Sequence, residues 1–403
     1  MEPVDEDDGI EAVKVMNRRH FITTASSFAL ATHAAEPARK WRVVVLGNKG
    51  SYGHSLDTMW MKVPGTEIVA AADPDAAKLE ATLKELKITQ GVADYHEIGK
   101  AKPHLVAIGS AMGLHRDMVL VAAASGARGI YLEKPFCRTL AEADEIIAAC
   151  EKHGVKLALA HRNRWHPTLP VVKRLVQEGV IGRLLELRGR GKEDRRGGME
   201  DLWVLGSHVL NLGVFLAGKP VACSAAIMQD GKPVTQADVI RTKADFGPIA
   251  GNEVHSRFDL ESGVPFYFDS IKEAGDPKVG FGLQLIGTKG IIDIRVDQTP
   301  LAHLCSGSPF QPMKEARTWL PISAAGVGEP EPVADIGRQV MSHATGALDL
   351  IASIEDKNRQ PLCSGMDGRL TVEMITAVMA SHVRQGERVS FPLDAQENPL
   401  ASW

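Results

Sequence analysis

The stretch RVVVLGNKGSYGHS, residues 42–55, joins an apolar run of strand length to a turn that contains Gly47, Gly50 and Gly53. Glycines in such a turn let the backbone bend tightly and approach a pyrophosphate, to which the following helix N-terminus offers free N–H groups. The spacing is G-x-x-G-x-x-G, whereas the usual dinucleotide fingerprint is G-x-G-x-x-G. The stretch therefore predicts a nucleotide-binding strand, turn and helix, with an ordinary glycine-rich turn as the alternative.

Apolar runs and segments with helical spacing alternate along the chain around this stretch. The runs predicted to be strands are 42–47, 67–73, 104–109, 129–134 and 156–162. The segments predicted to be helices are 55–63, 76–86, 115–127 and 140–154. Uniformly apolar strands that alternate with helices predict a parallel sheet covered on both faces. Residues 41–165 are therefore predicted to form an α/β Rossmann domain, a doubly wound parallel sheet.

Parallel sheets of this kind bind ligands at the carboxyl ends of their strands. This rule places Gly47, Asp73, Gly109 and Lys134 along one edge. An acid at the end of the second strand accepts hydrogen bonds from the adenosine ribose hydroxyls, which is the role predicted for Asp73. No arginine follows Asp73 within the next several residues to neutralise a 2′-phosphate, so NAD is favoured over NADP as the cofactor.

Residues 166–403 have a different pattern of predicted secondary structure, in which helices come first and most strands follow. The predicted helices are 170–183 and 203–218, with closing helices at 346–358 and 369–386. The predicted strands are 184–191, 221–229, 238–247, 252–261, 264–273 and 281–296, and 307–335 is predicted to be loop. The pattern predicts a substrate-binding α+β domain with a largely antiparallel open sheet, and the part from residue 340 on can pack back on both domains.

The composition excludes several classes of partner. The 403 residues are 44% hydrophobic and 24% charged, with a net charge of −4, so no global field attracts nucleic acid or an anionic membrane. The five cysteines form no CxxC motif, and no His/Cys cluster has metal-ligand spacing. No run reaches the roughly 18 apolar residues of a membrane span. We expect a small-molecule partner, no metal, no nucleic acid and no membrane span.

Residues 1–40 differ from the rest of the chain. Arg18 and Arg19 precede a charge-free, weakly apolar stretch that ends in small residues, which is typical of a twin-arginine export signal. The preceding acidic residues suit such a signal poorly, so translation is predicted to start at Met16. We expect a protein exported to the periplasm, with a disordered tail on a cytoplasmic protein as the alternative.

The glycine-rich turn and Asp73 occur together with YLEKPF, residues 131–136, at the end of a predicted strand. In this combination the chain resembles the Gfo/Idh/MocA family, the relatives of glucose-fructose oxidoreductase and inositol dehydrogenase. The resemblance spans residues 41 to about 393. It rests on DPD (73–75), His115, EKPFCRTLAEAD (133–144), RNRWHP (162–167), GVIGRLLEL (179–187), GSHVLNLGVFLAG (206–218), LIGTKGIIDI (285–294) and GERVSFPL (386–393).

The resemblance implies roles for the residues around this motif. Lys134 is expected to bind substrate and relay protons, and Glu133 to lie near the nicotinamide ribose. Pro135 matches a proline that is often cis and aims the lysine into the cleft. His208 is expected to be the general base, with a core histidine bonded to a backbone carbonyl as the alternative. Independently of the family, a lysine at a buried strand end beside a positive nicotinamide is predicted to have a lowered pKa.

Other positions follow from the same resemblance. Gly109 and His115 join the expected cofactor-binding set, and Asn163 and Arg164 are expected to face the substrate cleft. Many relatives carry an aspartate four residues before the helix histidine, where this chain has Val204.

The acid that relatives often carry three residues after that histidine is also replaced, by Asn211, which we still assign to the substrate site. An acid from the loop 192–203 can complete the relay, and Asp201, Glu200 and Asp194 are the candidates. Otherwise the protein works without net oxidation or is not catalytic.

The expected function is an NAD-dependent oxidoreductase that acts on a sugar, cyclitol or related polyol. An NAD-assisted glycoside hydrolase or lyase that recycles its cofactor is the second hypothesis, and a non-catalytic sugar-binding protein is the third. By analogy with relatives, which often pair through the open face of the second sheet, we expect a homodimer or homotetramer.

Overall fold

The computed structural model describes residues 40–47, 56–242, 245–276, 278, 280–312 and 316–403. Residues 40–403 form one compact unit. The glycines at 50 and 53 and the arginine pair at 18 and 19 lie outside the described residues, so the predictions for them stay untested.

A six-stranded parallel sheet forms the first layer, in the order β3-β2-β1-β4-β5-β6. Its strands are β1 (Trp41–Leu46), β2 (Thr66–Ala72), β3 (Gly91–Val92), β4 (Leu105–Ile108), β5 (Gly129–Leu132) and β6 (Lys156–Leu159). This is the Rossmann strand order, so the predicted α/β fold is confirmed. The order reverses between β1 and β4, which is where sheets of this kind bind a dinucleotide.

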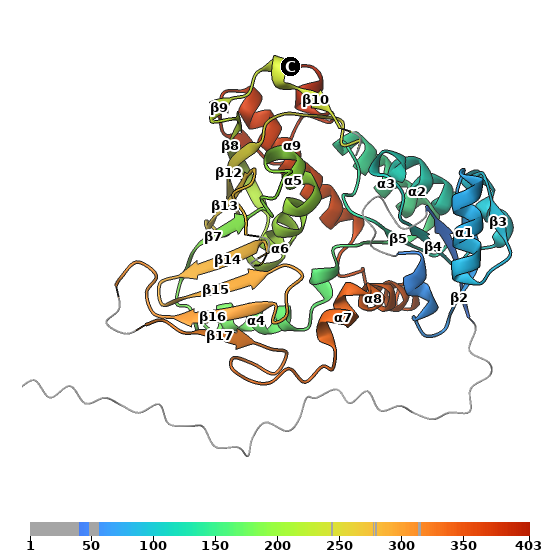
Figure 1. The fold of residues 1–403 in the computed structure, drawn as a ribbon, viewed down its shortest axis with the longest axis horizontal. Helices are drawn as coiled ribbons and strands as arrows, with labels where there is room; N and C mark the ends of the chain where they lie inside the picture. The colour runs from blue at the N-terminus through green and yellow to red at the C-terminus, as the bar shows by residue number, and fades with distance from the viewer. Residues whose placement is uncertain (1–39, 48–55, 243–244, 277, 279, 313–315) are drawn as a thin grey trace, which may run out of the picture. The chain divides into compact units, whose positions relative to one another are not determined.

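Two separate cores cover the two faces of this sheet because its strands place apolar side chains on both faces. Val44 and Leu46 of β1 pack in the core shared with helices α2 (His115–Ala124) and α3 (Leu140–His153). Val43 and Val45 pack on the other face, with helix α8 (Ala344–Glu355) from near the end of the chain. Figure 1 shows α2 and α3 on one side of the strands and α8 on the other.

The remaining helices and turns of the described residues either lie between strands of the parallel sheet in the chain or follow this sheet in the chain. The α-helices not yet given are α1 (Ala76–Leu86), α4 (Thr168–Gln177), α5 (Gly198–Asp201), α6 (Ser207–Ala217), α7 (Ile336–Met341) and α9 (Gly365–Val383). The short 3-10 turns are η1 (Thr58–Met61), η2 (Tyr95–Ala101), η3 (Met112–Leu114), η4 (Arg162–Trp165), η6 (Gln236–Asp238) and η7 (Pro399–Ala401), and η5 (Leu202–Gly206) is a π-helical turn. None of the described helices combines the length and the apolarity needed to cross a membrane.

Local signals explain why several of these helices begin and end where they do. Asp75 caps α1 by accepting the amide of Lys78, and Thr139 caps α3 by accepting that of Glu142. Gly154 ends α3 in a left-handed conformation. The bounds of α1 match the prediction.

The second sheet has ten strands within the described residues, in the order β17-β16-β15-β14-β7-β13-β12-β8-β18, with β9 paired to β8. Its strands are β7 (Leu184–Arg190), β8 (Pro220–Gln229), β9 (Lys232–Pro233), β12 (Glu253–Leu260), β13 (Pro265–Ile271), β14 (Gly282–Gly287), β15 (Gly290–Arg295), β16 (Ala302–Ser306), β17 (Trp319–Ile322) and β18 (Val389–Ser390). β7 and β13 pair in parallel and the other pairs are antiparallel. The predicted, largely antiparallel sheet is confirmed.

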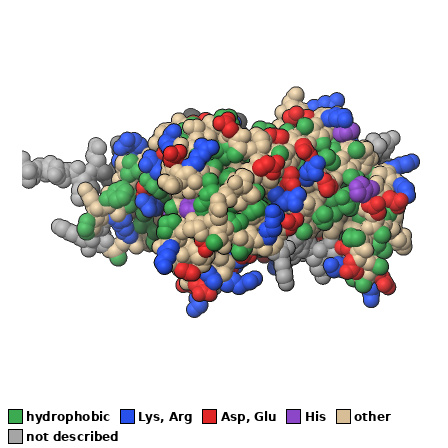
Figure 2. Space-filling model, turned by 90° about the horizontal axis from the view of Figure 1, so that it is seen from above, with side chains coloured by type: hydrophobic (Ala, Val, Ile, Leu, Met, Phe, Trp, Pro, Cys, Tyr) green, Lys and Arg blue, Asp and Glu red, His purple; other side chains and the backbone are tan. Residues whose placement is uncertain are grey.

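One face of this sheet is buried and the other is open. Every second residue of β12 is buried, from Val254 to Leu260, and the residues between them are partly or fully exposed. Helices α5, α6 and α9 lie on the buried side (Figure 1). On the face of the molecule drawn in Figure 2, positive and negative side chains are interspersed, as the near-balanced charge of the sequence suggests.

Three local predictions were wrong. Residues 307–335 contain strand β17, whose four residues include Pro321; a short edge strand tolerates proline, and such a strand gives little sequence signal. In the described part of 238–247 the strand is limited to β10 (Ile240–Arg241), which pairs with β11 (Pro248–Ile249). In the described part of 55–63 only the turn η1 forms, because Pro64 disfavours helical backbone in the residue before it.

Candidate active site

The carboxyl ends of the parallel strands bring most of the predicted cofactor residues to one edge. Gly47 follows β1, Asp73 follows β2, Gly109 follows β4 and Glu133 follows β5. Gly47 has φ 81°, and a Cβ atom there would lie 2.9 Å from the backbone nitrogen of Ser110. Only glycine fits where the turns after β1 and β4 meet, which leaves bare backbone at the strand-order reversal, as a dinucleotide phosphate requires.

Asp73 is held at the end of β2 by the turn that leads into α1. Its Oδ1 accepts the backbone N–H of Asp75 at 2.9 Å, and Asp75 in turn caps α1. The carboxylate is half-buried and lies at the end of a strand beside β1. This is the position from which an acid can accept hydrogen bonds from ribose hydroxyls.

His115 connects two turns of this edge. Its Nδ1 lies 3.0 Å from the carbonyl oxygen of Pro135 and 3.1 Å from that of Phe136, and its Nε2 lies 3.1 Å from that of Ser110. Burial lowers the pKa of His115. The Lys134–Pro135 peptide bond is cis, which confirms that expectation. His115 therefore joins the turn after β4 to the EKP turn after β5.

Lys134 is a buried cation at the centre of this edge, with 1% of its surface exposed. Its Nζ donates to the carbonyl oxygen of Val204 at 2.9 Å. Val204 lies in the π-helical turn η5, a kind of turn that is frequent at functional sites. At the position where relatives carry an acid, this chain thus offers the lysine a backbone carbonyl.

The electrostatics of Lys134 suit proton transfer. Burial lowers the pKa of Lys134 to about 8, with Glu133 and Asp297 opposing the shift and Arg162 and Arg196 adding to it. The lowered pKa predicted from the sequence is confirmed. A lysine that titrates near neutral pH exchanges protons readily at the pH of a cell.

His208 lies one helical turn after Val204, on α6, and contacts a second histidine. Its Nδ1 is 3.2 Å from Nδ1 of His161, and the two rings are nearly perpendicular, with centroids 4.9 Å apart. Burial, with Lys134 and Arg164 nearby, lowers the pKa of His161 to about 3. His161 was missed in the sequence, although it directly follows the apolar run 156–160 at a strand end.

Arg162, Asn163 and Asp297 form a cluster that ties η4 to the second sheet. Arg162 donates to the Asp297 carboxylate through Nε at 3.0 Å and Nη2 at 2.7 Å. Asn163 donates to the same carboxylate at 2.9 Å and accepts the Asp297 N–H at 3.3 Å. Asp297, which follows β15, was not predicted because its partners are distant in sequence. The substrate role of Asn163 stays a prediction.

Arg164 and Asn211, both predicted to bind substrate, bind each other. Nη1 of Arg164 donates to Oδ1 of Asn211 at 2.9 Å, and Nη2 donates to the Leu362 carbonyl at 2.6 Å and to Asp367 at 3.3 Å. The guanidinium also lies 4.3 Å from the ring centroid of Phe215. These contacts join α6 to the start of α9, so Arg164 has a structural function whatever its part in substrate binding.

Two of the candidate acids of loop 192–203, Asp201 and Asp194, have partners within the segment that carries the second sheet. Asp201 is fully buried, and its Oδ2 accepts the Glu193 N–H at 3.0 Å and the Ser270 hydroxyl at 2.7 Å. Burial raises the pKa of Asp201. The hydrogen bond from Arg196 lowers the pKa of Asp194 to about 2. Within the described residues, no group of three or more His, Cys, Asp or Glu side chains is arranged to hold a metal ion.

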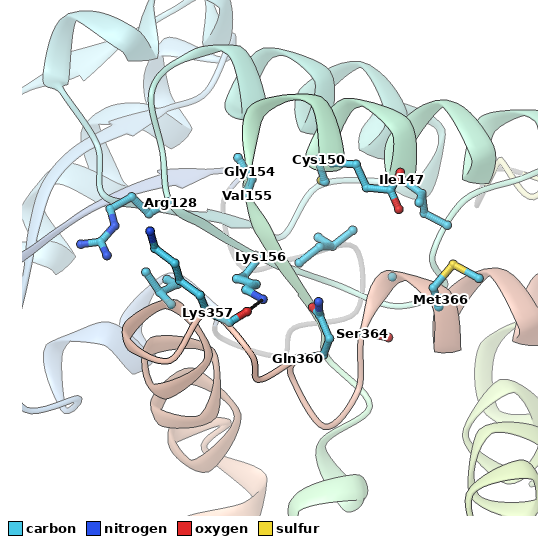
Figure 3. A pocket seen from close by; sticks show the side chains of 14 residues that line it. Arg128, Ile147, Cys150, Gly154, Val155, Lys156, Lys357, Gln360, Ser364 and Met366 are labelled. Carbon is cyan, nitrogen blue, oxygen red and sulfur yellow. Dashed lines mark hydrogen bonds between the residues drawn. The ribbon is translucent and has the colours of Figure 1, made fainter.

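A cavity of about 640 Å³ lies at the opposite end of the parallel strands (Figure 3). Arg128, which precedes β5, and Lys156, which begins β6, line it, together with Met366 at the start of α9. Because these residues are at the amino ends of the strands, this cavity is separate from the edge that carries Lys134.

Comparison with known proteins agrees with this geometry. Residues 41–161 match GFO_IDH_MocA, the oxidoreductase family with an NAD-binding Rossmann fold. The chain is 31% identical over 194 residues to D-apiose dehydrogenase of Paraburkholderia graminis, which covers 45% of this chain and 51% of that protein. It is 23% identical over 255 residues to levoglucosan dehydrogenase of Pseudarthrobacter phenanthrenivorans, covering 57% and 65%. The chain thus spans less than two thirds of the length of these relatives.

The similarity in structure extends further than the similarity in sequence. A levoglucosan dehydrogenase in complex with NADH and levoglucosan superposes with a TM-score of 0.68 at 19% identity, covering 88% of this chain and all of that one. At this identity the match concerns the fold, and it includes both sheets.

Proposed function

Because the chain belongs to the Gfo/Idh/MocA family of oxidoreductases, we propose that it is an NAD-dependent oxidoreductase acting on a hydroxyl group of a sugar, cyclitol or related polyol. The observation that carries the proposal is Lys134, a buried lysine with a pKa near 8 at the strand edge that matches an NAD-binding domain. The names of the relatives, dehydrogenases of D-apiose and of levoglucosan, support a carbohydrate-like substrate. Residues 41–165 take the cofactor and residues 166–403 complete the substrate site.

The residues at the carboxyl edge of the parallel sheet fit NAD, and each has a separate role in binding or in proton transfer. Gly47 and Gly109 leave the backbone open for the pyrophosphate, and Asp73 binds the adenosine ribose. When bound, NAD supplies the group that accepts hydride from the substrate carbon. His208 takes the hydroxyl proton, and Lys134 holds the hydroxyl oxygen and relays the proton onward. The alcohol thereby loses one hydride and one proton and becomes a carbonyl.

Turnover with added NAD tests the proposal directly. The purified protein is incubated with NAD and a panel of sugars, cyclitols and anhydrosugars, and reduced nicotinamide is followed by its absorbance. We expect stoichiometric reduction of NAD with at least one of them. Turnover of a glycoside without net reduction would instead assign a recycled cofactor, and sugar binding by a protein that binds no nucleotide would reject an enzyme altogether.

Replacing Asp73 by serine is expected to weaken NAD binding by about tenfold, because the ribose loses a charge-assisted hydrogen bond. NADP binding is expected to improve relative to NAD, since the carboxylate no longer repels the 2′-phosphate. Titration of both nucleotides against the wild type and the variant measures this. Asp75→Ser, which changes the N-cap of α1 in the same turn, is the control and is expected to keep the preference for NAD over NADP. A wild type that already prefers NADP would contradict the prediction.

We also propose that residues 1–40 direct export by the twin-arginine route to the periplasm, a route that carries folded proteins and suits one that binds its cofactor before export. The support is the Arg18-Arg19 pair and the charge-free stretch after it. Arg18→Lys with Arg19→Lys is expected to abolish periplasmic accumulation in cell fractionation while total protein is maintained. Unchanged accumulation would rule out this route.

A homodimer or homotetramer through the open face of the second sheet is the assembly we propose. The face is partly exposed along β12 and β13, which alternate between buried and less buried residues. Light scattering of the purified protein measures the mass, and a value of one chain, 43.5 kDa, would contradict the proposal.

A further inference from the structure

His161 and His208 lie nitrogen to nitrogen at the candidate active site. The two Nδ1 atoms are 3.2 Å apart, a hydrogen-bonding contact that requires one proton between them. His161 is held there because it lies two residues after the end of β6 and its backbone carbonyl accepts the N–H of Arg164 at 2.9 Å. His208 is held by α6, whose core face packs on the second sheet.

Burial and the charges around the pair keep His161 neutral. Burial is the largest cause of its low pKa, and the cations of Lys134 and Arg164 add to it, while Glu133 opposes them. His161 therefore offers a neutral ring to His208. The neighbours of His208 include the ring of Phe281, with centroids 6.4 Å apart. They also include Val204, one turn earlier, whose backbone carbonyl accepts a hydrogen bond from Nζ of Lys134.

The shared proton can lie on Nδ1 of either histidine while both rings are neutral. Only one of these two arrangements keeps the hydrogen bond when His208 accepts a second proton. If Nδ1 of His161 carried the proton, a charged His208 would place a second N–H against it, because an imidazolium has no acceptor. If Nδ1 of His208 carries the proton, His208 can gain a proton on Nε2 and keep the same hydrogen bond. Only in the second arrangement is Nε2 of His208 unprotonated, the state in which it can accept a proton.

We propose that His161 is the positioning residue of His208: its Nδ1 accepts the Nδ1–H of His208 and so holds His208 in the tautomer whose Nε2 is basic. This rests on the proposed function, in which His208 takes the hydroxyl proton. In many enzymes a carboxylate fixes the tautomer of a catalytic histidine. In this chain Val204 occupies the helix position where such an acid is expected. The neutral imidazole of His161 orients His208 instead.

Nitrogen NMR of the histidine side chains tests the tautomer without any substrate. Long-range proton–nitrogen correlation spectra are recorded at neutral pH on protein labelled with ¹⁵N-histidine, with His208 assigned from the signals lost in His208→Gln. We expect a protonated Nδ1 and an unprotonated Nε2 on His208. His161→Gln, whose amide oxygen can accept the same hydrogen bond, is expected to preserve this pattern, and His161→Phe to lose it.

The control is His166→Phe, a second buried histidine of the same segment that is bonded to the Thr168 amide, and it should leave the His208 signals unchanged. A wild-type His208 protonated at Nε2 and not at Nδ1 would overturn the proposal. So would a pattern that survives in His161→Phe, because no acceptor remains at position 161. Circular dichroism and NAD titration establish that each variant is folded and binds nucleotide.

With a substrate from the turnover screen, His161→Phe is expected to lower kcat by about 10- to 100-fold with little change in the KM for NAD. His161→Gln is expected to recover most of the loss. Equal losses in both variants would reject the positioning role. If no substrate of the screen is oxidised, the proposed function fails while the tautomer measurement still decides the role of His161.

Discussion

Lys134→Met is expected to lower kcat by about 10²- to 10⁴-fold while NAD still binds, because the variant removes the proton relay and keeps the bulk of the side chain. The lysine is buried at the end of β5 and donates to the carbonyl of Val204. Steady-state turnover and NAD titration separate loss of chemistry from loss of binding. Lys100→Met, at an exposed lysine that pairs with Glu97, is the control and should match the wild type.

The same variant is expected to be more stable than the wild type at neutral pH. Burial lowers the native pKa of Lys134 from 10.5 to about 8, so below that pH the charged lysine destabilises the fold. At about 1.4 kcal/mol per pKa unit the cost is about 3 kcal/mol, and the hydrogen bond lost in the variant offsets about 1 kcal/mol. We expect a gain of about 1 to 2 kcal/mol in the free energy of unfolding.

This gain is expected to disappear at alkaline pH. Between the native pKa near 8 and the unfolded pKa of about 10.4, only the unfolded chain binds the proton, so the wild type gains stability with rising pH and the variant does not. Urea unfolding of the wild type and the variant, at neutral pH and just above the unfolded pKa, measures the difference in the free energy of unfolding at each pH. A variant that is equally destabilised at both would show that Lys134 carries no burial penalty, and unchanged turnover would remove it from the mechanism.

Arg164→Met is expected to lower the free energy of unfolding by about 3 kcal/mol, because it leaves Asn211, the Leu362 carbonyl and Asp367 without their buried cation. Urea unfolding of the variant measures the loss. If Arg164 served only the substrate, the free energy of unfolding would stay the same and the KM for substrate would rise.

Arg188→Met is the matched control for this change. Arg188 also stacks on an aromatic ring, Tyr267, and pairs with Glu186, but about half of its side chain is exposed. Solvent screens such a pair, so we expect a loss below about 1 kcal/mol. Equal losses in the two variants would contradict the structural role that we assign to the buried position of Arg164.

The parallel sheet was predictable because its strands are short and apolar and alternate with helices that carry their own caps. The bounds of α1 followed from spacing alone, since Asp75 and the apolar positions after it are local signals. Strand β17 was missed because its signal is four residues long and only its pairing with β16 makes it a strand.

The candidate site divides in the same way. The positions of Gly47, Asp73 and Lys134 could be predicted because each lies within two residues of the end of an apolar strand, and parallel strands bring such positions to one edge. Asp297 could not, because its partners Arg162 and Asn163 are separated from it by more than one hundred residues. Asp201, one of the acids proposed from loop 192–203, has partners in its own loop and in β13, as its contacts with Glu193 and Ser270 show.

The sequence by itself determined the doubly wound parallel sheet and predicted which strand ends share an edge and that the pKa of Lys134 is lowered. Hydrophobic period, glycine position and burial at a strand end are properties of neighbouring residues. Only the tertiary structure decided what Lys134 and His208 touch. Nζ of Lys134 donates to the backbone carbonyl of Val204. Every residue has a backbone carbonyl, so no sequence pattern could identify this one as the partner. His208 on α6 meets His161, which lies 47 residues earlier beyond the end of β6, so only the folded chain brings the two rings together.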